Sequence, residues 1–274
     1  LSLLGFALPI FTIVAQGSLT YQRPPEEIAK LVEAPLPPQV QVSPDHAWMM
    51  LLERSDYPTI EELSRPELRI AGLRINPDNF GPSRATYYVG IKAKKISDNK
   101  EYEITGLPAA PLLSSFSFSP DSKKAAFLHS LPDRIELWMV DLTTMAASKV
   151  SDRKISNVMG GSYDWLSDSQ HILFSAVPSN LVKVPEPSRV PVRPVVEENL
   201  GRKAPSRTYQ DLLKDPYDEA LFEYYGSSEL VLKSIGGEEK IISKSAMHYT
   251  VSHSPDGRYI LARIMHHPLS YLVT

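Results

Sequence analysis

The sequence predicts an all-β fold, an incomplete β-propeller of about four blades or part-blades with a Pro-rich, partly helical insertion. One short turn sequence occurs four times, a compact apolar strand follows each copy, and strands of alternating polarity lie between the copies. The four turns are Ser43-Pro44-Asp45, Ser119-Pro120-Asp121, Leu166-Ser167-Asp168 and Ser254-Pro255-Asp256.

The repeated turn has the chemistry of a tight reversal between two antiparallel strands. Proline presets φ for the first central position, and aspartate bonds the backbone two residues later. Gly257 closes the fourth turn, and a polar residue stands at the same position in the other three. The apolar runs that follow, such as residues 125–128 and 172–174, are short and bulky, which is typical of strands buried on both faces.

A second kind of strand recurs between the turns. Apolar and polar residues alternate in segments 87–92, 135–142 and 229–235, and each is followed by another short strand. Each repeat is therefore predicted to contain four strands. Pro120 and Ser167 lie 47 residues apart, close to the roughly 40–50 residues of a four-stranded propeller blade. A β-sandwich also has many short strands, but it does not repeat one turn at this period.

The other repeats are longer because they contain insertions. The turn prolines Pro44 and Pro120 are 76 residues apart, and Ser167 and Pro255 are 88 apart. We therefore expect residues 16–274 to form a propeller portion with insertions at about 55–86 and 178–225. Propellers typically have about four to eight blades, and an open ring exposes sheet edges, so we expect this portion to belong to a larger ring.

Each insertion leaves a functional and a purely structural interpretation open. Residues 178–225 combine a Pro-rich stretch with a helix-forming run after Asp215-Pro216, and they could gate a channel, contact another domain or simply pack against the blades. Residues 55–86 begin with a capped helical turn and are locally basic. Their arginines could bind a carboxylate of a ligand, although pairing with surface carboxylates is more common. These arginines are Arg65, Arg69, Arg74 and Arg84.

Residues 1–15 are almost entirely apolar and end in small residues, as in a secretory signal peptide that begins inside its apolar region. A buried apolar strand is the alternative. The segment is shorter than the roughly 20 apolar residues of a membrane-spanning helix, so we expect an exported protein, periplasmic or at the cell surface, without a stable membrane span.

Composition excludes several classes of site. The chain has no cysteine, which excludes disulfides, thiolate zinc ligands and a cysteine nucleophile. Lys and Arg number 29 against 32 Asp and Glu, for a net charge of -3, so no overall positive field attracts nucleic acid.

The sequence predicts no catalytic, cofactor-binding or metal-binding residues and no cofactor. Gly160-Gly161-Ser162 resembles a nucleophile elbow, but bulky Asp164 and Trp165 follow and the segment precedes a turn, so we interpret it as a connection between blades. Gly226-Ser227-Ser228-Glu229 fails for the same reason. His266 and His267 are expected to be neighbours on a strand, where their side chains would point to opposite faces and could not share an ion.

Together, the Ser-Pro-Asp turns, the strand over residues 136–142 and the exported start resemble the amino-terminal propeller of the prolyl oligopeptidase family of serine peptidases. Three segments resemble its glutamyl endopeptidase branch, of the chloroplast type and its bacterial relatives. These segments are residues 57–63 with 66–77, residues 201–211 and residues 216–225.

The resemblance implies a two-domain enzyme whose Ser, Asp and His triad lies in a carboxy-terminal α/β-hydrolase domain that is not present in this chain. The propeller would restrict entry to peptides, and the branch implies cleavage after glutamate. The partners would be peptide substrates and the chain's own hydrolase domain. A non-catalytic periplasmic propeller of the Tol or WD type, acting as a protein-binding platform, is the alternative. A carbohydrate-active propeller is a weaker one, since no pair of carboxylates stands out.

Overall fold

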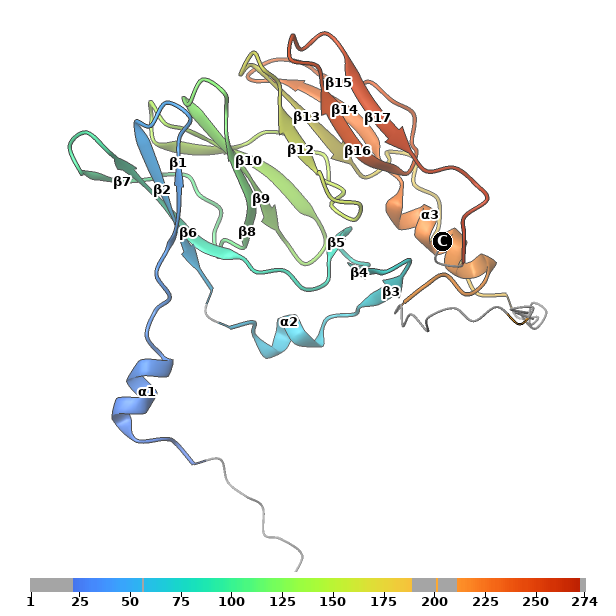
Figure 1. Cartoon of the computed structure of the whole chain (residues 1–274), viewed down its shortest axis with the longest axis horizontal. Coiled ribbons are helices and arrows are strands. Elements are labelled where there is room, and N and C mark those ends of the chain that lie inside the picture. The colour runs from blue at the N-terminus through green and yellow to red at the C-terminus, as the bar shows by residue number, and fades with distance from the viewer. Residues whose placement is uncertain (1–21, 56, 189–200, 202–210, 272–274) are drawn as a thin grey trace, which may run out of the picture. The chain divides into compact units, whose positions relative to one another are not determined.

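The computed structural model describes residues 22–55, 57–188, 201 and 211–271. Two compact units make up the chain, residues 1–35 and residues 36–274. The first contains α1 (Glu26–Val32), in which Lys30 and Glu26 form an ion pair of 2.9 Å. The second unit contains all the strands described below (Figure 1). Within the described residues, every helix is too short or too polar to cross a membrane.

The second unit is built from consecutive antiparallel blades, which confirms the predicted all-β, incomplete propeller. Two blades have four strands each and are joined by a bridge between Tyr88 and Leu113. Their strands are β1 (Gln39–Val42), β2 (Trp48–Arg54), β6 (Tyr88–Lys95) and β7 (Glu101–Glu103), then β8 (Leu113–Phe118), β9 (Lys124–Ser130), β10 (Ile135–Asp141) and β11 (Ala146–Lys149).

The third blade also has four strands, and a fourth blade is represented by two. The ring is not closed within the described residues. The strands are β12 (Tyr163–Trp165), β13 (His171–Ala176), β14 (Glu229–Ser234) and β15 (Glu239–Ile241), followed by the pair β16 (His248–His253) and β17 (Ile260–Ile264).

The repeated turns join the first and second strands of each blade and have the predicted chemistry. Each aspartate Oδ1 accepts a hydrogen bond from the backbone N–H two residues later, over 2.8–3.2 Å. The residue after each aspartate has positive φ, between 57° and 68°. In three of the four turns this residue is not glycine, so a left-handed conformation is maintained despite its cost. The four residues are His46, Ser122, Ser169 and Gly257.

The core lies between successive blades. Phe127 and Phe174 are fully buried, the first between blades one and two and the second between blades two and three. In β9 and β13 every residue after the first is buried, as predicted for strands covered on both faces. The fourth repeat differs, because Tyr259 is 68% exposed and Leu261 is 63% exposed. Within the described residues β17 pairs with β16 alone, so one face and one edge of it have no blade against them.

Both long connections contain their own secondary structure. The connection from β2 to β6 contains α2 (Ile60–Ser64) and a small sheet of β3 (Leu68–Ile70), β4 (Leu73–Asn76) and β5 (Gly81–Pro82). Thr59 and Glu62 form a capping box at the start of α2, as the sequence predicts. The connection from β13 to β14 contains α3 (Pro216–Gly226), capped by Asp215.

Candidate functional site

The two insertions pack on one another at one end of the blades. Each follows the second strand of its blade, so each leaves the propeller at the strand end remote from the repeated turns. Phe80 stacks obliquely on Tyr225 with ring centroids 5.2 Å apart, and Gly72 N donates to Asp211 O over 2.9 Å. Buried residues of both insertions form one apolar cluster, which includes Ile70, Ile75, Leu213, Leu221, Phe222 and Tyr225. The part of the second insertion over residues 211–226 therefore packs on the first insertion.

Three of the four arginines in the first insertion contact one carboxylate, Glu67. Its oxygens lie 2.7 Å from Arg69 Nε, 3.3 Å from Arg84 Nε and 3.9 Å from Arg74 Nη1. The Ser83 hydroxyl also donates to Glu67 over 2.6 Å. The hydrogen bonds from Ser83 and Arg69 hold the pKa of Glu67 below its ordinary value. Glu67 therefore holds Arg69, Arg74 and Arg84 together, whereas Arg65 lies 3.5 Å from Glu61.

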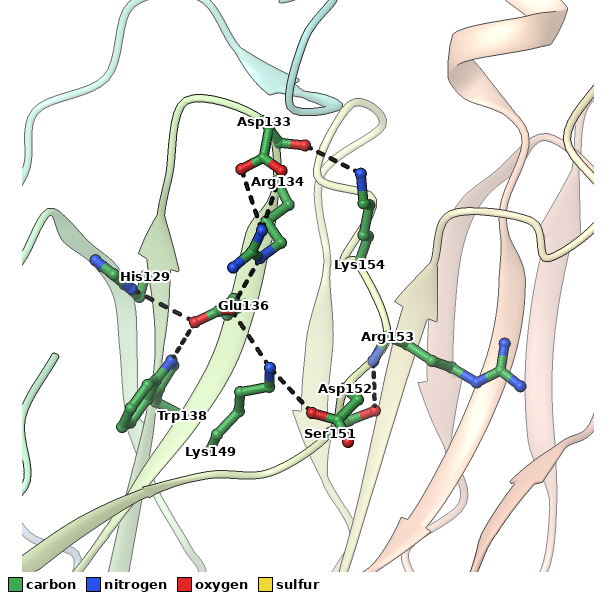
Figure 2. Close-up of polar contacts among 10 residues, drawn as sticks. All are labelled: His129, Asp133, Arg134, Glu136, Trp138, Lys149, Ser151, Asp152, Arg153 and Lys154. Atoms are coloured by element: carbon green, nitrogen blue, oxygen red, sulfur yellow. Dashed lines mark hydrogen bonds and ion pairs between the residues drawn. The ribbon is translucent and has the colours of Figure 1, made fainter. Parts of the chain in front are cut away.

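Glu136 on β10 is a buried carboxylate with three cationic or N–H partners (Figure 2). It accepts hydrogen bonds from Trp138 Nε1 and Arg134 Nε, both over 2.9 Å, and Lys149 Nζ lies 3.4 Å away. Burial by itself raises the pKa of a carboxylate, but the Trp138 and Arg134 hydrogen bonds and the Lys149 charge outweigh it and lower the pKa of Glu136 to about 2. Glu136 is therefore charged throughout the physiological range.

His129 faces this carboxylate but does not form an acid–base pair with it. His129 Nδ1 lies 3.7 Å from Glu136 Oε2, and neither ring nitrogen has a hydrogen-bond partner among the described residues. Burial lowers the pKa of His129, which keeps the imidazole neutral. No nucleophile of this network contacts His129. The contact between Glu136 and Lys149 instead links β10 to β11, which is a structural role.

The elbow-like segment is a connection between blades, as the sequence indicates. Gly160 and Gly161 both have positive φ, and buried Ser162 directly precedes β12. Ser162 O accepts a hydrogen bond from Ser175 N on the neighbouring strand. Its backbone is thus part of the blade ladder rather than of a strand-to-helix turn.

A buried Ser–His contact was not predicted from the sequence. Ser228 Oγ lies 3.2 Å from His248 Nδ1, and both residues are buried. An isolated bridge between Ser228 and Ala246 brings the two together. In the described part of the chain no carboxylate contacts His248, and burial lowers the pKa of that imidazole. The contact lacks the third member that orients a catalytic histidine.

The placement predicted for His266 and His267 was wrong, because β17 ends at Ile264 and both residues lie beyond it. His267 turns to α3 instead, with Nδ1 2.8 Å from Glu219 Oε1 and Nε2 3.3 Å from Glu223 Oε2. Among residues 22–55, 57–188, 201 and 211–271, no group of three or more His, Asp or Glu is arranged to hold a metal ion.

Comparison with known proteins shows what the chain is similar to. It is 30% identical over 273 residues to a probable chloroplastic glutamyl endopeptidase of Oryza sativa subsp. japonica, and 32% identical over 265 residues to one of Arabidopsis thaliana. These matches cover 95% and 92% of the chain. The chain is a relative of the glutamyl endopeptidases. The resemblance of its insertions to this branch is thereby confirmed.

The chain spans 29% and 28% of the length of these two glutamyl endopeptidases. A solved prolyl endopeptidase structure aligns with 73% of this chain and 26% of its own, at 16% identity and a TM-score of 0.40. No protein family model matches the chain. The four-stranded blades show that the chain is a propeller segment, and the two sequence matches show that it is related to peptidases.

Proposed function

We propose that the chain is the substrate-gating propeller portion of an exported serine peptidase that cleaves peptides after glutamate. The observation that carries the proposal is the similarity to glutamyl endopeptidases over nearly the whole chain, insertions included. The Ser, Asp and His triad would lie in a carboxy-terminal α/β-hydrolase domain. There serine attacks the peptide carbonyl, histidine acts as base and then as acid, and aspartate orients the imidazole.

The packing of the insertions supports a gating role. A propeller selects substrates by size only if its end surfaces keep their shape, and the apolar cluster formed by the two insertions fixes one such surface. The ion pair between Glu136 and Lys149 links β10 to β11 in the second blade. Export is supported by the apolar composition of residues 1–15, which lie outside the described residues.

The experiment is to express the full-length protein and treat it with a fluorophosphonate probe, which labels activated serines. Cleavage of a quenched peptide with glutamate at the cleavage site is compared with cleavage of its glutamine counterpart and of a folded protein containing the same sequence. We expect labelling, preference for the glutamate peptide and little cleavage of the folded protein. Absence of labelling and of cleavage would contradict the peptidase function and favour the binding platform.

A further inference from the structure

Successive blades are linked where the repeated turns lie, but the link differs between blade pairs. Ser122 Oγ accepts a hydrogen bond from the turn of blade one, and Ser169 Oγ accepts one from the turn of blade two. The fourth turn has Gly257 at this position, which has no hydroxyl to accept a bond from Asp168 N in the turn of blade three. The third and fourth blades are therefore joined without this hydroxyl link.

The first strands of the blades show the same difference. The hydroxyl of Tyr163 on β12 lies 2.8 Å from Ala126 O and 3.0 Å from Ser117 Oγ, so it ties β12 to blade two. Between blades three and four, β12 contacts β16 through Asp164 Oδ2 and His253 Nδ1, which lie 3.0 Å apart. The side chain of Asp164 is 53% exposed. A polar pair in contact with water contributes little to stability, so this contact is a weak tie.

A cavity of about 230 Å³ lies where blade three meets β16. Its lining comes mainly from β12, β13 and β14, and Val251 of β16 completes it. Protein interiors normally contain few voids larger than a water molecule. The apolar residues that blade four packs against blade three are only partly buried, namely Val251, Ile260 and Ala262. The two blades are thus loosely packed against one another.

Blade four is firmly attached at its other end. Ser228 and Ala246 exchange two backbone hydrogen bonds, of 2.9 Å and 3.1 Å. Met247 is buried in the apolar cluster of the insertions, and His267 contacts Glu219 of α3. Ser228 precedes β14 and Met247 precedes β16, so these contacts lie at the strand ends remote from the repeated turns. Blade four is therefore held at the insertion end and loosely tied at the turn end.

We propose that the junction of blades three and four is a hinged seam. In its open form β16 and β17 move away from blade three at the turn end, while the bridge between Ser228 and Ala246 stays closed and acts as the hinge. Opening exposes Leu173, which is buried against blade four in the structure. The inference concerns the conformation of the propeller and does not depend on the proposed peptidase function.

The test measures how fast a thiol reagent labels single introduced cysteines in the folded full-length protein, after subtraction of the labelling of the unsubstituted protein. Leu173→Cys places a thiol in the seam. Leu128→Cys is the matched control, because it makes the same change between blades two and three, where Leu128 is fully buried. We expect Leu173→Cys to be labelled about tenfold faster, near the effect of one missing hydrogen bond on an opening equilibrium. Circular dichroism verifies that each variant is folded.

Restoring the missing hydroxyl should close the seam. In the Leu173→Cys protein, Gly257→Ser should slow labelling about 2- to 12-fold relative to Gly257→Ala, the range for one hydrogen bond. Both substitutions place a Cβ where nothing lies within 4 Å, and both bear the cost of positive φ, so they differ in the hydroxyl alone. Equal labelling of the two Gly257 variants, or labelling of Leu173→Cys no faster than that of Leu128→Cys, would overturn the inference.

Discussion

Ser122 Oγ accepts a hydrogen bond of 3.1 Å from Asp45 N, across 77 residues of sequence, and so joins the repeated turns of the first two blades. Ser169 Oγ accepts the equivalent bond from Asp121 N over 2.9 Å, between the second and third blades. Both serines are buried and have positive φ. Gly257 stands at this position in the fourth turn and has no side chain to accept such a bond. Each serine thus has two roles. It adopts the left-handed conformation of its own turn, and its hydroxyl accepts a hydrogen bond from the turn of the preceding blade.

The dual role of Ser122 predicts a difference between two substitutions. Ser122→Ala loses the bond to Asp45 and retains the left-handed backbone, so it should lower the free energy of unfolding by about 1–2 kcal/mol. Ser122→Gly loses the same bond but removes the conformational cost of about 1 kcal/mol, so it should be nearly neutral. Urea denaturation of the full-length protein measures both. Equal destabilisation by alanine and glycine would show that φ strain plays no part.

Glu136 predicts a pH dependence of stability. Its folded pKa, about 2, is below the ordinary value of 4.5. A depressed carboxylate pKa contributes stability above the unfolded pKa, and that contribution disappears as the pH falls from about 4.5 towards 2. After allowance for solvent screening, Glu136→Gln should cost about 2 kcal/mol at pH 7.

The measurement is a comparison of unfolding midpoints for Glu136→Gln and the unsubstituted protein between pH 7 and pH 2.5. The two curves should converge as the pH falls, because protonation removes the charge that the substitution has already removed. Glu53→Gln is a control, since Glu53 forms a single exposed ion pair with Lys92. A gap that stays constant across the range would contradict an electrostatic role for Glu136.

The sequence was sufficient to predict the features that depend on neighbouring residues. The aspartate bonds and the four-stranded blades follow from local turn chemistry and period-two patterning. The contact between Ser228 and His248 and the packing of Phe80 on Tyr225 join segments far apart in sequence, for which a single sequence gives no signal. The expectation that His267 lies on a strand was wrong for a local reason. The pattern of apolar and polar residues around His267 did not indicate that β17 ends at Ile264.

The buried contact between Ser228 and His248 predicts a negative result in the activity assay. Because no carboxylate contacts His248 within the described residues and Ser228 is buried, this serine should not be the nucleophile. Ser228→Ala should therefore leave fluorophosphonate labelling and peptide cleavage unchanged. A variant that is folded by circular dichroism yet is no longer labelled would contradict this and place the nucleophile in the propeller.

His267 predicts that the segment after β17 is held more firmly at lower pH. Its contacts with Glu219 and Glu223 raise the pKa of the imidazole. A raised folded pKa contributes stability below the unfolded value of about 6.5, and the contribution is lost as the pH rises through the folded pKa. Tyr271 also donates to Glu219 over 2.9 Å, so part of the attachment does not depend on the charge of His267.

Hydrogen exchange of residues 265–271 should therefore be slower at pH 5.5 than at pH 8.5, once intrinsic exchange rates are corrected for pH. His267→Gln should remove this pH dependence, while Tyr271→Phe should speed exchange at both pH values and leave the dependence in place. His253→Gln is the matched control, since His253 contacts Asp164 on another blade. Loss of the pH dependence in that control, or its persistence in His267→Gln, would show that a different group holds the segment on α3.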